Sequence, residues 1–180
     1  MMHTEDAFVR ALPAGEWADV TVVNEGGLMG GGRAIQADAI WQREGGVPAR
    51  LKCLVESTPS AGNTTADLLN RPRLERMQAR LSYAAKRAPA SLVRLLHVGF
   101  LPRFPGLLIA MERVQPLRQV TESLRLSPQQ AAQLIRTLSH NGAGWIHFDI
   151  CPANTGLTSD GRYVFIDPDS YYSIDAGRYQ

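Results

Sequence analysis

The stretch WIHFDICPANTGLTSDGRYVFIDPDS, from Trp145 to Ser170, decides how this sequence is interpreted. It holds Asp149, then Asn154 in the same polar segment, and Asp167 at the end of the apolar run YVFI. The pattern predicts a short strand, a loop, a second short strand, a turn and a third strand. Carboxylate and amide oxygens are hard ligands of the kind that Mg²⁺ prefers. The stretch therefore places metal-binding side chains in a loop and at the end of a strand.

The length and composition are those of an ordinary globular protein. The chain has 180 residues, of which 44% are hydrophobic and 20% charged, enough for one domain or for two small lobes that share a cleft. The net charge is only +2, and the basic residues are scattered along the sequence. We therefore expect no nucleic-acid partner. No apolar run approaches the roughly 20 residues that span a bilayer, and residues 1–17 lack the pattern of a signal peptide. We therefore expect a cytoplasmic protein that does not bind membranes.

Cysteine and lysine are both rare in the chain. Cys53 and Cys151 are far apart and form no CxxC motif, so we expect neither a disulfide framework nor a zinc site. Lys52 and Lys86 are the only lysines among 19 basic residues. Because Lys52 falls inside a predicted strand, its ammonium group is a candidate for a specific role, although a surface lysine at a strand edge is the alternative.

Alternating apolar and polar residues predict five strands in the first part of the chain, and helical spacing predicts one helix after the third strand. The glycine-rich residues 24–32 are expected to form a loop or tight turn. The predicted strands are residues 17–23, 33–41, 49–55, 91–100 and 106–114, and the helix is residues 72–87 with an apolar stripe of Leu74, Met77, Leu81 and Ala84.

A second helix is predicted at residues 128–140. Ser127 and Gln130 have the spacing of a capping box, and Pro128 stands at the first helical position. The segment NGAG at residues 141–144 is expected to end this helix.

The order of these elements and the motif H-x-D-x-x-x-x-N at His147, Asp149 and Asn154 resemble the protein-kinase-like superfamily. Asp167 then matches the metal-binding aspartate of that family, and Lys52 matches its third-strand lysine. The resemblance implies an α+β, two-lobed fold. Residues 1–114 would form a lobe with a five-stranded antiparallel sheet and one helix, and residues 115–180 a partial, mainly helical lobe that carries the catalytic loop.

The resemblance implies an ATP- and Mg²⁺-dependent phosphotransferase. Asp149 would orient the acceptor hydroxyl or take its proton, Asn154 and Asp167 would bind Mg²⁺, and Lys52 would contact the α- and β-phosphates. The helix acid that pairs with Lys52 would be Glu75. The segment 111–114 falls at the hinge between the lobes, so further nucleotide-binding residues would be Glu112 and Val114 of the hinge and Gly30, Gly31 and Gly32 of the glycine-rich loop.

Several alternatives stay open. Asp149 and Asn154 could be turn formers, Asp169 could be a second metal ligand or a turn residue, and the glycine-rich loop could be a hairpin tip or a lid over the phosphates. His147 is interpreted as a structural residue that hydrogen-bonds to backbone. The acceptor could be a protein or a small molecule. The chain could also be a pseudokinase-like or truncated module that binds nucleotide without turnover, with a partner chain or a missing C-terminal segment covering the partial lobe.

Overall fold

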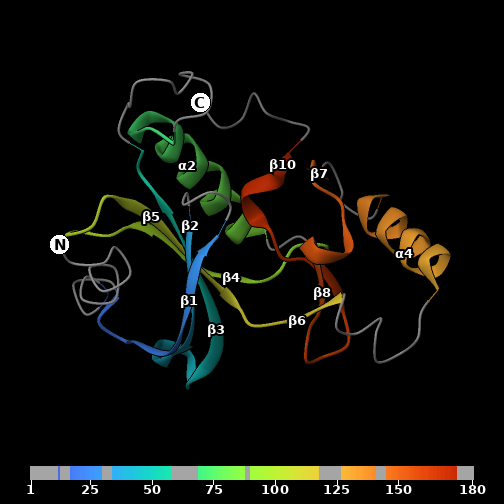
Figure 1. Ribbon diagram of the computed structural model, residues 1–180, viewed down its shortest axis with the longest axis horizontal. Coiled ribbons are helices and arrows are strands. Elements are labelled where there is room, and N and C mark those ends of the chain that lie inside the picture. The colour runs from blue at the N-terminus through green and yellow to red at the C-terminus, as the bar shows by residue number, and fades with distance from the viewer. Residues whose placement is uncertain are drawn as a thin grey trace. The chain divides into compact units, whose positions relative to one another are not determined.

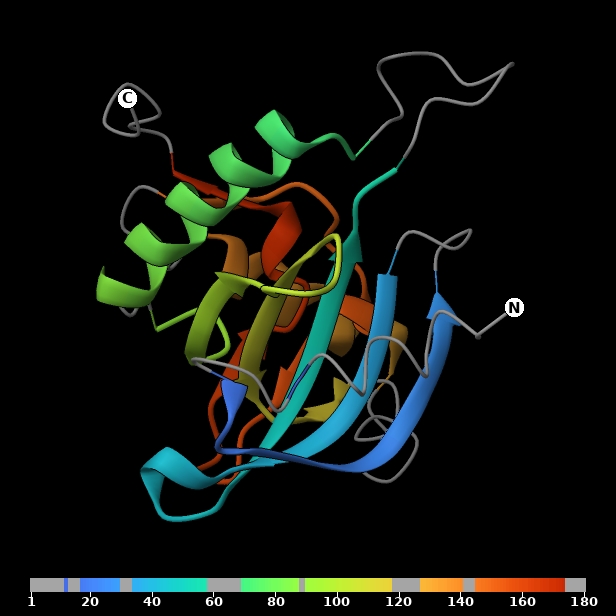
Figure 2. The same ribbon diagram turned by 90° about the vertical axis from the view of Figure 1, so that its left-hand side faces the viewer.

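Five antiparallel strands form one sheet, as the alternating pattern predicted. They pair in the order β1-β2-β3-β5-β4 (Figure 1). Helix α2 follows β3 in the chain and packs against the sheet (Figure 2). The strands are β1 (Val20–Met29), β2 (Ala34–Trp41), β3 (Val47–Val55), β4 (Leu95–Phe100) and β5 (Gly106–Glu112), and the helix is α2 (Arg71–Arg87). The structure is a computed structural model that describes residues 12, 17–29, 34–57, 69–87, 90–117, 127–140 and 145–173.

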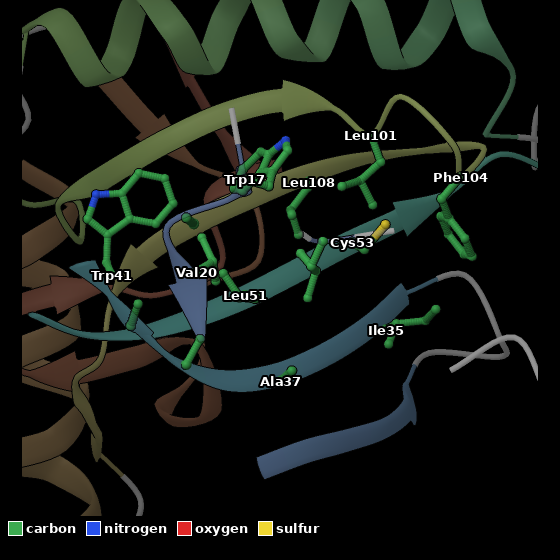
Figure 3. Close-up of a cluster of buried hydrophobic side chains, with 14 residues drawn as sticks. Trp17, Val20, Ile35, Ala37, Trp41, Leu51, Cys53, Leu101, Phe104 and Leu108 are labelled. Atoms are coloured by element: carbon green, nitrogen blue, oxygen red, sulfur yellow. The ribbon is translucent and has the colours of Figure 1, made fainter. Parts of the chain in front are cut away.

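A buried apolar cluster covers one face of this sheet (Figure 3). Alternate residues of the central strand β3, namely Ala49, Leu51 and Cys53, have no exposed surface. The ring of Trp17 packs edge-on against that of Trp41, with 5.8 Å between the centroids. Burial raises the pKa of the Cys53 thiol to about 12, so this thiol stays protonated and packs as an apolar residue.

The apolar stripe of α2 is buried as predicted. Its members Leu74, Met77, Leu81 and Ala84 are at most 7% exposed. The side chain of Asn70 caps the first turn, because its Oδ1 accepts a hydrogen bond of 3.1 Å from the backbone N–H of Arg73. The guanidinium of Arg71 lies 3.5 Å from the ring centre of Phe100, which ties the start of the helix to the end of β4.

Two details of the first part differ from the prediction. Strand β1 continues to Met29 through residues expected to form a loop, and its pairing with β2 shifts register twice, between Val22 and Asn24 and between Glu25 and Leu28. Such bulges allow a glycine-containing strand to stay paired. The predicted strand 91–100 is also divided: only Leu95–Phe100 joins the sheet, whereas Ser91 and Val93 hydrogen-bond to Phe165.

The prediction of a mainly helical second part is wrong. Its described residues form mainly short strands, with α4 (Pro128–His140) as the α-helix. A three-stranded sheet has the order β6-β8-β9, and a two-stranded ribbon joins β7 to β10. These strands are β6 (Gln115–Pro116), β7 (Trp145–His147), β8 (Thr155–Leu157), β9 (Tyr163–Phe165) and β10 (Tyr171–Ser173). The residue pattern of 145–170 had predicted the short strands β7, β8 and β9. Helix content was overestimated because the mainly helical lobe was taken from the resemblance and not from the residue pattern.

The start of α4 has the predicted capping box. The backbone N–H of Ser127 donates to Oε1 of Gln130 at 2.8 Å, and the backbone N–H of Gln130 donates to Oγ of Ser127 at 3.2 Å. These two bonds satisfy donors that a helix start otherwise leaves without partners.

The chain divides into two compact units. One consists of Met1–Ser82 and Leu95–Glu112, and the other of Tyr83–Arg94 and Arg113–Gln180. The boundary after Glu112 lies inside the segment predicted to be a hinge. In the part of the chain that the structure describes, none of the helices has the length and apolar character needed to cross a membrane.

Candidate functional site

The polar loop between β7 and β8 has a defined local structure. After Cys151 the chain forms a single 3₁₀ turn, Pro152–Asn154 (η4), which Pro152 favours because its ring fixes φ near the helical value. The backbone oxygen of Cys151 accepts hydrogen bonds from the backbone N–H of Asn154 at 3.0 Å and from Oγ1 of Thr155 at 3.1 Å. The turn therefore directs the chain from the loop into β8 and positions the Asn154 side chain.

Asn154 is bound directly to Asp149. Its Nδ2 donates to the backbone oxygen of Asp149 at 3.0 Å and to the carboxylate Oδ2 at 2.7 Å. Both acceptors are oxygens, so the amide nitrogen must face Asp149. The amide oxygen is then held away from Asp149 and is the atom that could ligate a cation. The same contact restrains the Asp149 carboxylate, although the Asp149 side chain is exposed.

His147 connects this loop to Asp167. Its ring is buried, and Nε2 lies 2.9 Å from the backbone oxygen of Asp167. The backbone N–H of Asp149 donates to Nδ1 of the same ring at 3.2 Å. These partners require a neutral ring with its hydrogen on Nε2. The contacts agree with the interpretation of His147 as a structural residue.

The surroundings of His147 keep the ring neutral. Burial lowers its pKa below the ordinary value of 6.5, although the Asp167 carbonyl and the Asp167 and Asp149 carboxylates act in the opposite direction. The imidazole also stacks on the ring of Phe165, with 4.5 Å between the centroids and an angle of 17° between the planes. This stacking, together with the two hydrogen bonds, fixes the ring orientation.

Asp167 lies two residues beyond β9 and is half-buried. The backbone N–H of the preceding residue, Ile166, donates to the backbone oxygen of Asn154 at 2.9 Å, so the two candidate metal-binding segments run together at this point. The Asp167 carboxylate accepts a hydrogen bond of 3.1 Å from Oγ of Ser170. A 3₁₀ turn, Pro168–Ser170 (η5), follows and contains Asp169, which is also half-buried.

The donor set near Asp167 suits a hard cation that keeps other ligands. Within the described residues, no group of three or more His, Cys, Asp or Glu side chains could hold a metal ion. One carboxylate from Asp167 and one amide oxygen from Asn154 would leave most positions to water or phosphate oxygens, which is the usual pattern for Mg²⁺. These residues therefore fit Mg²⁺ bound together with a phosphate ligand better than a metal held by protein alone.

The other predicted residues of the first unit lie on β3, α2 and β5. Lys52 is half-buried on β3, between Gln36 of β2 and Ile109 of β5 in the register. It lies two residues from Arg50, which forms an ion pair of 2.8 Å with Asp38. The side chains of Arg50 and Lys52 alternate with those of the buried cluster, so a polar row occupies the opposite face of β3.

Glu75, the predicted partner of Lys52, forms an ion pair with Arg71. The distance is 3.1 Å between the Glu75 carboxylate and Nε of Arg71, within the same helix, and the Glu75 side chain is 57% exposed. The burial pattern of α2 explains this ion pair. Leu74 belongs to the buried stripe, whereas the next residue, Glu75, lies on the exposed side of the helix.

The predicted hinge residues fall on either side of the unit boundary. Glu112 ends β5 and pairs with Ala49. Val114 packs against β8, since a Cβ on Gly156 would come within 2.6 Å of its Cγ2. Gly156 is required there because any side chain would collide with Val114. Gly30, Gly31 and Gly32 lie outside the described residues.

Sequence reasoning missed Tyr171, which anchors β10. Its side chain is 1% exposed, and its hydroxyl lies 2.7 Å from Oγ of Ser91. The ring stacks on Trp145 of β7 with 5.1 Å between the centroids. Burial raises the pKa of Tyr171, and the bond to Ser91 opposes this. The aromatic pair in SYYS was the available signal, but the run is too short to separate from a turn.

The comparisons with known proteins add no relatives. No family model matches the chain, and a search of curated proteins gave no match. The fold is an α+β arrangement with a five-stranded antiparallel sheet, a packed helix and additional small sheets.

Proposed function

We propose that this chain is an ATP- and Mg²⁺-dependent phosphotransferase with a two-lobed, protein-kinase-like fold. The observation that carries the proposal is the bonding of His147 to the backbone of Asp167 and of Asn154 to Asp149. The bonds from Asn154 fix its amide and the Asp149 carboxylate relative to each other, and the bond from His147 holds the backbone of Asp167 beside this loop. Phosphoryl transfer depends mainly on positioning and on neutralising charge, which such a set provides.

Asp149 acts on the acceptor in this proposal. The carboxylate is exposed and restrained by the 2.7 Å bond from Asn154, so it can accept a hydrogen bond from an incoming hydroxyl without losing its own orientation. As the hydroxyl oxygen attacks the γ-phosphorus of ATP, its proton passes to Asp149. The bond between the γ-phosphorus and the bridging oxygen breaks, and ADP leaves.

Asn154 and Asp167 would hold Mg²⁺ with the phosphates. When bound, the cation neutralises charge on the phosphate oxygens. The chain's own contribution is rigidity: the backbone bond from Ile166 to Asn154 keeps the two ligands on adjacent segments, and the bond from Ser170 restrains the Asp167 carboxylate.

Lys52 contacts the α- and β-phosphates in this proposal. The lysine is on the central strand, and paired strands on both sides fix the position of its backbone. The strand order β1-β2-β3-β5-β4 with a helix after β3 supports the resemblance on which this assignment rests. Glu112 and Val114 would contact the nucleotide at the hinge.

A nucleotide-binding module without turnover is the second candidate. It is favoured by the described residues after Glu112, which form mainly short strands and α4 rather than a mainly helical lobe. These described residues therefore offer few helices that could bind and orient an acceptor. A partner chain could supply such elements.

A thermal-shift measurement, followed by a phosphate assay on the same sample, distinguishes the two candidate functions. ATP is expected to raise the melting temperature only when Mg²⁺ is present, and the same sample is then assayed for loss of the γ-phosphate. Stabilisation with phosphate loss supports the enzyme, and stabilisation without it supports the module. Equal melting temperatures with and without Mg²⁺ and ATP would contradict both.

A further inference from the structure

The side chain of Ser170 is bonded to the candidate metal ligand Asp167. Its Oγ donates to Oδ2 of the Asp167 carboxylate at 3.1 Å. The two residues lie at the two ends of the 3₁₀ turn η5, three positions apart. Side chains three residues apart lie one above the other in a 3₁₀ turn, so the backbone itself brings the hydroxyl to the carboxylate.

The backbone of Ser170 is held on both sides. Its N–H donates to the backbone oxygen of Asp167 at 3.2 Å, and its oxygen accepts a hydrogen bond of 2.9 Å from the backbone N–H of Phe148. The next residue, Tyr171, is buried, and its hydroxyl lies 2.7 Å from Oγ of Ser91. The Ser170 hydroxyl therefore extends from a fixed position, and Oδ2 of Asp167 has a protein donor already in place.

This bond makes the two oxygens of the Asp167 carboxylate unequal. Oδ2 accepts from Ser170, and hydrogen bonds to an ionised acceptor are among the stronger ones in proteins. A cation that takes a single carboxylate oxygen leaves the bond intact. A cation that takes both oxygens together competes with the Ser170 hydroxyl for Oδ2.

Mg²⁺ and Ca²⁺ differ in how they use a carboxylate. Mg²⁺ is small, requires near-octahedral geometry at about 2.0–2.1 Å, and combines one or two carboxylates with water and phosphate oxygens. Ca²⁺ accepts about six to eight oxygens at about 2.3–2.6 Å and can take both oxygens of one carboxylate. The bond from Ser170 therefore disfavours a mode of binding that Ca²⁺ uses and Mg²⁺ does not need.

We infer that Ser170 is a positioning residue that makes the proposed site select Mg²⁺ over Ca²⁺. This inference rests on the proposed function, in which Asp167 binds the cation together with ATP. The hydroxyl holds Oδ2 and thereby limits how the carboxylate can turn toward a cation. Without the hydroxyl, the carboxylate can turn and present both oxygens, so the disadvantage of Ca²⁺ is removed.

The test measures the dissociation constant of ATP for the full chain by titration calorimetry, once with excess Mg²⁺ and once with excess Ca²⁺. The quantity compared is the Kd with Ca²⁺ divided by the Kd with Mg²⁺. The preference of ATP itself for either cation is the same for every variant and cancels in the comparison. Ser170→Ala should lower this ratio about tenfold relative to the wild type, which corresponds to one hydrogen bond to a charged group.

Two further variants separate this role from a structural one. Ser170→Thr keeps a hydroxyl at the position and should retain the wild-type ratio. Ser127→Ala is the matched control, because it removes a serine hydroxyl that accepts a hydrogen bond of 3.2 Å at the start of α4, in the same unit. It should also retain the ratio, since a loss of stability alone weakens binding with both cations equally.

Three results would overturn the inference and leave the proposed function standing. They are an unchanged ratio in Ser170→Ala, an equal fall of the ratio in Ser127→Ala, and a fall in Ser170→Thr as large as that in Ser170→Ala. In each case the wild type still binds ATP with Mg²⁺. A wild type that binds ATP with neither cation would contradict the metal site, and with it both the inference and the proposed function.

Discussion

The Nε2 atom of His147 lies 2.9 Å from the backbone oxygen of Asp167, and this contact joins the loop that holds Asp149 to the strand end that holds the candidate metal ligand. Because Nδ1 of the same ring accepts a hydrogen bond from the backbone of Asp149, the ring can serve both segments only when it is neutral. Protonation would place a hydrogen on Nδ1 and break the bond to Asp149. The geometry of the site is therefore coupled to the protonation state of His147.

The first prediction concerns the pH dependence of stability. The pKa of His147 is lowered in the folded state, so the unfolded chain binds the proton more readily. The stabilising contribution of His147 is fully present above pH 6.5, the ordinary pKa of the group. It is lost as the pH falls from there through the lowered pKa of the folded state. His147→Gln should lower the unfolding free energy by about 1–3 kcal/mol near pH 8. It should also make the unfolding free energy fall less steeply between about pH 7 and 5.5 than it does in the wild type.

Urea unfolding at a series of pH values, followed by tryptophan fluorescence, measures both effects. The measurement near pH 8 gives the cost of losing the hydrogen bonds and the stacking on Phe165, and the slope at lower pH gives the proton linkage. Parallel pH profiles for the wild type and His147→Gln would contradict the neutral-ring arrangement.

The second prediction distinguishes Asp167 from Asp169 as a metal ligand. Asp167→Ala should weaken Mg²⁺-dependent ATP binding by more than about tenfold, since changes to residues that only support metal ligands already cost about 10–100-fold. The alanine keeps the backbone oxygen that His147 uses, so the fold of the site is preserved. Asp169→Ala, in the 3₁₀ turn that follows, is the matched control and should have a smaller effect. Equal losses in a Mg²⁺ titration would make both aspartates ligands.

The sequence was sufficient to predict the elements with strong periodicity. The buried stripe of α2, the capping box at Ser127 and Gln130, and the five strands of the main sheet each depend on local patterns that tertiary contacts reinforce. The helix stripe was predictable because four apolar residues at helical spacing have only one way to be buried together. The strands of the sheet were predictable because alternation fixes their two faces.

The rest depends on contacts between residues distant in sequence. The pairing of β10 with β7 and the bond from Tyr171 to Ser91 join segments whose local sequences give no sign of one another. For the same reason Ser91–Val93 was assigned to a strand of the main sheet, although it bonds to Phe165. The polar loop was located by its motif, but the direct bond between Asn154 and Asp149 required the structure.

The third prediction uses the two lysines of the chain. Lys52→Ala should weaken ATP binding by about ten- to a hundredfold, which corresponds to the loss of one hydrogen bond to a charged group. Lys86→Ala is the matched control, because Lys86 is exposed in the last turn of α2 and should leave ATP affinity unchanged. Isothermal titration with Mg²⁺ and ATP compares the variants. Equal ATP affinity of Lys52→Ala and Lys86→Ala would show that Lys52 does not bind the nucleotide.

The most direct test of the phosphotransferase is Asp149→Asn, assayed for ATP affinity and for loss of the γ-phosphate from Mg²⁺-bound ATP. The asparagine keeps a side-chain oxygen that can accept the bond from Asn154, so the loop should retain its structure. We predict unchanged ATP affinity and a loss of turnover of roughly a hundredfold or more, as expected when a positioned general base is removed. Turnover equal to that of the wild type would contradict the assignment of Asp149 and, with it, the proposed function.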